Sequence, residues 1–163
     1  MYLTTASTTE RVPFLSNRLL QVYTAAFLLF WAWTFIGTTD RANWFTENAL
    51  TMLFISGLAW THRRFKFSDL SYSLMFLYIL LHVYGAMYTY AENPLGYWLQ
   101  DIFHTERNHY DRIVHFSFGF LLAYPMRDYF RNHFQWPTWV CWVLPVEITM
   151  SFSAAYELVE WAV

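Results

Sequence analysis

The chain has 163 residues, of which 13% are charged and 23% are aromatic, and its formal net charge is −2. Soluble domains carry about 25% charged residues, and the interior of a globule of this length is too small for so many Trp, Phe and Tyr side chains. The composition therefore predicts an integral membrane protein. A near-neutral charge without a basic stripe also excludes a nucleic-acid-binding protein.

The first apolar segment is the clearest membrane-spanning helix in the sequence. Residues 19–39 contain no charged side chain. About 21 residues, at a rise of about 1.5 Å each, cross a hydrocarbon layer of about 30 Å. Since no small-residue cleavage site follows this segment, we expect an uncleaved membrane anchor instead of a removed signal peptide.

Four more apolar segments predict helices over residues 45–61, 70–91, 110–129 and 137–163. The second is short and is closed by basic residues, and the last opens at Pro137, which suits the first turn of a helix. We expect Pro145 to kink that last helix. Residues 92–109 are expected to form an external loop. The predicted fold is all-α, a single polytopic membrane bundle over residues 1–163 with about five transmembrane helices.

The distribution of lysine and arginine predicts the orientation of this bundle, because short loops rich in these residues stay in the cytoplasm. With a cytoplasmic amino terminus, the inner segments hold more basic residues than the outer ones. The inner set is Arg11, Arg18, Arg63, Arg64, Lys66, Arg127 and Arg131, and the outer set is Arg41, Arg107 and Arg112. We therefore expect a bacterial inner-membrane protein with its amino terminus inside.

Ionisable side chains interrupt the last three predicted helices, where each costs roughly 2.5–3.5 kcal/mol on insertion scales. Alternating helix direction brings the end of the third helix, the start of the fourth and the end of the fifth to the outer side. We therefore expect one polar pocket that opens outward and is lined by His82, Asp111, His115, Glu157 and Glu160. Small residues on the same helix faces let these helices approach closely. Glu147 is expected to face elsewhere, as a proton-relay member or a cap for backbone freed by Pro145.

Imidazole and carboxylate groups in this arrangement are ligands for zinc, manganese or iron. The metal hypothesis takes His82, Asp111, His115 and Glu157 as ligands of a divalent transition metal, with Glu160 as general base toward a metal-bound water. A site at the outer leaflet suits a lipid or lipid-linked substrate. The chain contains no compact signature such as His-Glu-x-x-His, so the spacing leaves other interpretations open.

The alternative is a non-catalytic membrane protein, either a proton or ion carrier or a scaffold. In that case Arg112 neutralises Asp111, His115 donates to Glu157, and the polar side chains hold the helices together. Membrane lipids are the expected partners in both hypotheses. Aromatic side chains at the predicted boundaries are typical of interfacial anchors: Tyr84, Tyr88, Tyr90, Tyr97, Trp98 and Trp136.

Three motifs resemble the YjdF-like family of bacterial inner-membrane proteins. They are HVYGAMYTY at residues 82–90, RNHYDRIVH at 107–115 and YELVEW at 156–161. The resemblance implies a multi-helix inner-membrane protein and no particular activity. Members of that family continue past the Glu-x-x-Glu helix into a segment with Asp and Trp and a further membrane helix. We therefore expect a truncated chain, with carboxylates from the missing part completing the pocket.

Overall fold

A computed structural model describes residues 12–162, and the side chains of residues 156, 157 and 159–162 lie outside this description. Within that range the secondary structure is entirely helical. The elements are η1 (Phe14–Ser16), α1 (Arg18–Gly37), α2 (Arg41–Arg64), α3 (Asp69–Met87), α4 (Pro94–Phe103), α5 (Tyr110–Asn132) and α6 (Thr138–Ala162). The predicted all-α class is confirmed.

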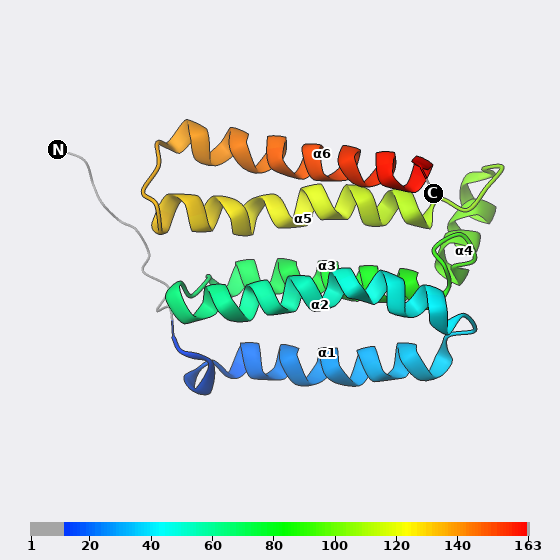
Figure 1. The fold of residues 1–163 in the computed structure, drawn as a ribbon, viewed down its shortest axis with the longest axis horizontal. Coiled ribbons are helices and arrows are strands. Elements are labelled where there is room, and N and C mark those ends of the chain that lie inside the picture. The colour runs from blue at the N-terminus through cyan, green and yellow to red at the C-terminus, as the bar shows by residue number, and fades with distance from the viewer. Residues whose placement is uncertain (1–11, 163) are drawn as a thin grey trace.

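The long helices α1, α2, α3, α5 and α6 lie side by side and alternate in direction, while the short α4 sits at one end (Figure 1). This α4 end holds the end of α3, the start of α5 and the end of α6. The opposite end, here called the basic end, holds the loops at residues 65–68 and 133–137. The backbone therefore carries the positions of all the predicted site residues toward the α4 end, as helix alternation predicted.

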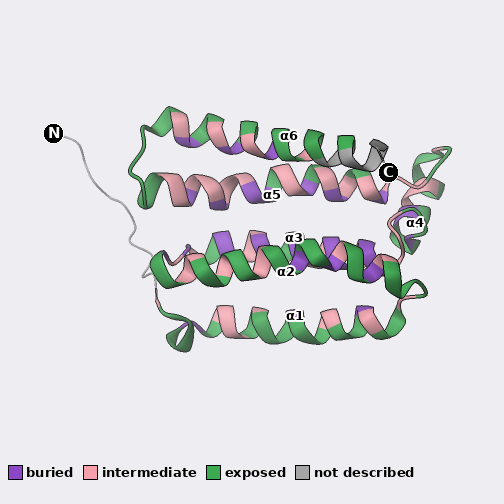
Figure 2. Ribbon diagram, in the orientation of Figure 1, coloured by how far each residue is buried: buried purple, intermediate pink, exposed green. Residues whose placement is uncertain are grey.

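Helix α3 is the centre of the bundle. It packs against α1, α2 and α5, whereas α6 packs mainly on α5. Half of the residues in α3 are buried, compared with 11% in α1 and 17% in the first 18 residues of α6 (Figure 2). The outer faces of α1 and α6 present apolar side chains such as Leu29, Ile36 and Met150, which is the surface that lipid requires.

Among the residues that the structure describes, three helices are long and apolar enough to cross a membrane: α1, α3 and residues 138–155 of α6. Helices α2 and α5 have 24 and 23 residues and run beside them, but both carry more charged side chains. In α2 these lie mainly near the two ends, and in α5 they include Asp111 and Arg112 in the first turn and Asp128 in the interior.

Several helix ends differ from the prediction for local reasons. Helix α2 begins at Arg41 instead of residue 45, because the Asp40 carboxylate accepts a hydrogen bond from the Asn43 amide at 2.9 Å and caps the first turn. Helix α3 ends at Met87 instead of residue 91. The backbone turns there into left-handed geometry, with φ of 53° at Thr89 and 54° at Tyr90.

The expected loop at residues 92–109 contains helix α4, so that part of the prediction is wrong. Asn93 is fully buried, and its side-chain oxygen accepts from the amides of Leu95 at 3.0 Å and Gly96 at 3.4 Å. Pro94 occupies the first helical turn, where its missing N–H costs nothing. The Asn108 side chain donates to the Asn93 carbonyl at 2.9 Å and joins the two ends of the segment.

Candidate functional site

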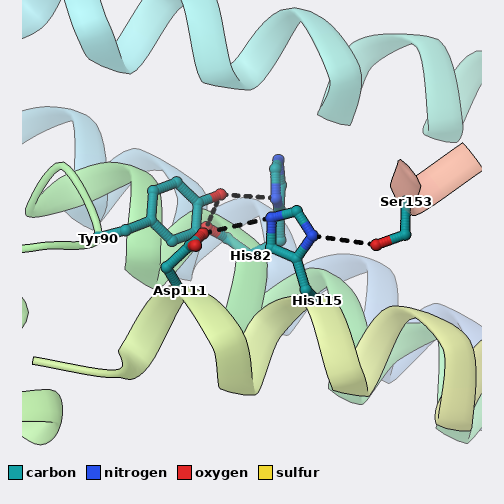
Figure 3. Close-up of polar contacts among 5 residues, drawn as sticks. All are labelled: His82, Tyr90, Asp111, His115 and Ser153. Atoms are coloured by element: carbon teal, nitrogen blue, oxygen red, sulfur yellow. Dashed lines mark hydrogen bonds and ion pairs between the residues drawn. The ribbon is translucent and has the colours of Figure 1, made fainter. Parts of the chain in front are cut away.

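A cluster of polar side chains lies inside the bundle toward the α4 end. It consists of His82 on α3, Tyr90 in the turn after α3, Asp111 and His115 on α5, and Ser153 on α6 (Figure 3). We call this set the polar cluster. Side chains from separate helices meet there, so the cluster depends on the tertiary packing and not on one local motif.

His115 joins α5 to α6 through Nδ1, while its Nε2 contacts a carboxylate on its own helix. Nε2 lies 3.3 Å from Oδ1 of Asp111, one helical turn earlier on the same face. Nδ1 lies 3.2 Å from the Oγ of Ser153. The exposed fraction is 22% for the His115 side chain and 50% for Asp111, so the imidazole is sheltered while the carboxylate is still accessible.

His82 joins α3 to α2 and to the turn that follows α3. It is 7% exposed, with Nε2 3.3 Å from the Glu47 carbonyl and Nδ1 2.8 Å from the Tyr90 hydroxyl. Because a carbonyl only accepts, Nε2 of a neutral His82 carries the proton and Nδ1 accepts from Tyr90. The Tyr90 ring packs directly on Gly85, where a β-carbon would overlap it.

The polar cluster lies along a groove of about 540 Å³ between α2, α3, α5 and α6, which we call the wide groove. Most of its remaining lining is apolar, including Ile79, Phe118 and Met126. Along α5 it extends from Asp111 to Met126, roughly 22 Å at about 1.5 Å per residue. The groove is therefore polar toward the α4 end and apolar over the rest of its length.

Thr51 supplies a second kind of polar group to the wide groove. The side chain lines the groove and is 1% exposed. Its hydroxyl oxygen has no hydrogen-bond partner among the described residues. Buried hydroxyls are nearly always hydrogen-bonded, so Thr51 leaves an unsatisfied polar group in the wall of the groove.

A second groove of about 520 Å³ separates α5 from α6, and we call it the α5–α6 groove. It extends toward the basic end as far as Arg127, whose guanidinium carbon lies 4.1 Å from the centre of the Trp142 ring. His115 and Ser153 line this groove as well as the wide groove. The contact between these two side chains is thus reached from both sides.

The structure brings together three of the predicted site residues and leaves two undescribed. His82, Asp111 and His115 line one groove. Glu157 and Glu160 lie on the last turns of α6, but their side chains are outside the described set. Among the side chains that are described, no three His, Cys, Asp or Glu residues are grouped to hold a metal ion, so the metal site stays a prediction.

Sequence reasoning missed other members of the site. Tyr90 was assigned to the interface by its residue type, yet its hydroxyl contacts His82. Ser153 contacts His115 from α6, and Thr51 lines the wide groove from α2. A serine or threonine in an apolar helix carries no charge and leaves no strong signal in a sequence, whereas a carboxylate does. Glu147 is exposed on α6, away from the polar cluster, as expected.

Comparison with known proteins identifies the family. Residues 19–163 match the family described as predicted membrane protein (DUF2238). The chain belongs to this family. The DUF2238 match includes every residue of the polar cluster. Together with the apolar helices, it establishes a helical membrane protein.

One relative of this DUF2238 chain is the inner membrane protein YjdF of Escherichia coli (strain K12). The two are 32% identical over 135 residues, which is 79% of this chain and 62% of YjdF. The resemblance seen in the three motifs is thereby confirmed. The chain spans less than two thirds of the length of that relative. No solved structure matches the chain.

Proposed function

We propose that this protein binds a lipid or lipid-linked molecule in the wide groove and acts on it at the polar cluster. The observation that carries the proposal is the composition of the groove: about 540 Å³ with apolar walls and a few convergent polar groups toward one end. Ligand sites typically combine apolar walls with a few placed polar groups. An amphiphile with one polar end and one long apolar part fits this distribution.

The two ends of the groove serve different parts of such a molecule. Asp111 and His115 lie near the α4 end, where a headgroup meets the membrane surface. Phe118 and Met126 line the apolar part, where an acyl or isoprenoid chain replaces contacts with lipid. The free hydroxyl of Thr51 offers one hydrogen bond to an ester or ether oxygen between them.

Photocrosslinking in membranes tests this proposal. A phospholipid with a diazirine on its acyl chain is expected to label the α5 segment around Met126. Met126→Trp, which fills the apolar part of the groove, should reduce that labelling. Met52→Trp is the matched control, because Met52 is 52% exposed on α2 and lines neither groove. Equal labelling of the wild type and both variants would remove the proposal.

A bound metal ion is one way to make this site catalytic. The proposed ligands of zinc, manganese or iron are Asp111, His115, Glu157 and His82, with Glu160 as the base. In support, the Asp111 carboxylate and the His115 imidazole meet on one face of α5. His82 would have to lose its hydrogen bond to Glu47 or to Tyr90 before it could bind the metal. Among the proposed ligands, its coordination therefore costs the most free energy.

Elemental analysis of protein purified without chelator tests the metal. We expect close to one equivalent of a transition metal per chain. His115→Ala should lose most of it, because that variant lacks the imidazole ligand. A metal content near zero that is the same in both proteins would contradict this part of the proposal and leave lipid binding intact.

The hydrogen bonds of the cluster favour a second candidate, a non-catalytic protein in which these side chains lock the helices. Both nitrogens of His82 and both nitrogens of His115 already have partners. A lock predicts that Asp111→Asn lowers the midpoint of thermal unfolding in detergent without changing any lipid product in cells. The exposed Asp101 on α4, changed to Asn, is the control. Flux measurements in liposomes separate a proton or ion carrier from a scaffold.

A further inference from the structure

Three residues of the polar cluster form a line of polar contacts, a hydrogen bond from Ser153 to His115 and an ion-pair contact from His115 to Asp111. The Oγ of Ser153 is 3.2 Å from Nδ1 of His115, and Nε2 of the same ring is 3.3 Å from Oδ1 of Asp111 (Figure 3). A hydroxyl, an imidazole and a carboxylate in this order constitute the arrangement that activates a serine nucleophile. Such a set is recognised by its geometry and not by its order in the sequence.

The partners of His115 determine which of its nitrogens acts as a base. Nδ1 is the ring nitrogen beside the Ser153 hydroxyl, so it can take the Ser153 proton in the tautomer that carries its own proton on Nε2. The negative charge of Asp111 beside Nε2 favours that tautomer and pairs with the imidazolium that forms.

The surroundings of Ser153 give a substrate access to its oxygen. Ser153 is partly buried and lines both the wide groove and the α5–α6 groove. An apolar chain therefore has room on either side of the hydroxyl. An ester bond that joins a polar headgroup to an acyl chain would lie at the level of Ser153 when the headgroup sits near Asp111.

From these observations we infer that Ser153 is a nucleophile toward carboxylic esters of lipids. This inference rests on the proposed lipid site and names its substrate class. The Ser153 Oγ forms a bond to the acyl carbon while its proton moves to Nδ1 of His115. The ester C–O bond breaks, and the leaving alcohol takes that proton. Water then attacks the acyl carbon and gives a proton to His115. The bond from that carbon to the Ser153 Oγ breaks, His115 returns the proton to this oxygen, and the fatty acid leaves.

A fluorophosphonate probe, which reacts with activated serine hydroxyls, tests the inference on the full chain in detergent. We expect one adduct per chain on the peptide that contains Ser153, and none in Ser153→Ala. Ser151→Ala is the matched control and should label fully, since Ser151 is exposed on the same helix and lines neither groove. His115→Ala should slow labelling by about 100-fold or more, because a positioned base contributes about that factor.

A second pair of variants covers the case in which loss of the hydroxyl disturbs folding. Ser153→Cys retains a nucleophile at the same place, and its alkylation by iodoacetamide should be faster than that of Ser151→Cys. Adding His115→Ala should abolish this difference. The natural thiol of Cys141 is fully buried and provides the background rate. Both reactions are measured with a metal chelator present, because a metal ion on Asp111 and His115 would occupy the base.

Three results would overturn the inference: no adduct on a wild-type chain that shows a cooperative unfolding transition, an adduct that persists in Ser153→Ala, or equal alkylation of the two cysteine variants. The result of the lipid crosslinking experiment does not depend on these three results. Crosslinks without a fluorophosphonate adduct would keep the lipid site and reject the nucleophile. An adduct on Ser153 without crosslinks would support the nucleophile and reject the wide groove as the lipid site.

Discussion

Helix α5 carries two aspartates, and their surroundings give one a structural role and leave the other accessible to a ligand. Asp128 is 6% exposed. Its Oδ2 accepts from the Ser68 amide at 3.0 Å and the Ser71 hydroxyl at 2.9 Å, and its Oδ1 accepts from the Asn132 amide at 2.7 Å. Asp111 is half exposed and contacts His115. Asp128 therefore fastens α5 to the start of α3, whereas Asp111 is open to a ligand.

Replacing Asp128 with alanine should destabilise the protein strongly. The change leaves the Ser68 amide and the Ser71 hydroxyl without this acceptor, and each buried unsatisfied group costs about 1–3 kcal/mol. The measurement is the midpoint of thermal unfolding in detergent. Asp101→Ala removes an exposed carboxylate from α4 and should leave the midpoint unchanged. An unchanged midpoint in Asp128→Ala would show that these contacts contribute nothing to stability.

The difference between charged and neutral polar groups also explains how much of the site the sequence predicts. His82, Asp111 and His115 are visible because an ionisable group is costly in an apolar helix, and helix alternation brings them to one end. The sequence does not mark Tyr90 and Ser153 as site residues, because tyrosine and serine are common in membrane helices. Their role depends on a turn at Thr89 and Tyr90 and on the contact of α5 with α6, neither of which follows from periodicity.

The length of an apolar segment predicts well that a long helix is present, but it predicts poorly where the helix ends and whether a short helix lies between two long ones. The predicted range 19–39 corresponds to α1 at Arg18–Gly37, and 110–129 corresponds to α5 at Tyr110–Asn132. Helix α4 was missed because its ten residues are too few to span lipid, so a search for membrane spans passes over it. Its start signal, Asn93 followed by Pro94, is present in the sequence and identifies a capped helix.

Two glycines in helices make a matched test of packing at the end of α3. An added β-carbon at Gly85 would overlap the Tyr90 ring, whereas nothing lies within 4 Å of one at Gly57 in α2. Gly85→Ala should therefore displace Tyr90 from His82 and destabilise the protein by about 1–3 kcal/mol, as overpacking does. Gly57→Ala should stabilise it by about 0.4–1 kcal/mol, because alanine reduces the entropy of the unfolded chain.

Thermal unfolding of both variants in the same detergent measures this difference. The two midpoints should move in opposite directions from that of the wild type. A rise in both would mean that Tyr90 does not pack on Gly85, and the account of how His82 is held would then be wrong.

In the whole molecule, helix direction follows from the sequence but lateral packing does not. Alternation of the long helices follows from short loops between α1, α2 and α3 and between α5 and α6, and from the α4 segment, which joins α3 to α5 at one end of the bundle. The central place of α3 is not predictable, because an apolar side chain that faces lipid has the same character as one that faces another helix. Only the packing itself shows that α3 is half buried while α1 is mostly exposed.

The two ends of the bundle also differ in charge, which allows orientation to be tested. The basic end carries Arg18, Arg63, Arg64, Lys66, Arg127 and Arg131, and the α4 end carries Arg41, Arg107 and Arg112. The excess of lysine and arginine predicts that the basic end faces the cytoplasm. The polar cluster would then lie in the outer half of the membrane and receive substrates from the outer leaflet.

Single cysteines at the two ends decide this orientation. In a Cys141→Ala background, Glu106→Cys marks the α4 end and Gln135→Cys marks the basic end, and both positions are exposed. A membrane-impermeant maleimide added to intact bacterial cells should label Glu106→Cys and should reach Gln135→Cys only after lysis. The opposite pattern would place the polar cluster in the inner half. Its substrates would then come from the cytoplasmic leaflet, while the geometry of His115, Asp111 and Ser153 would stand as described.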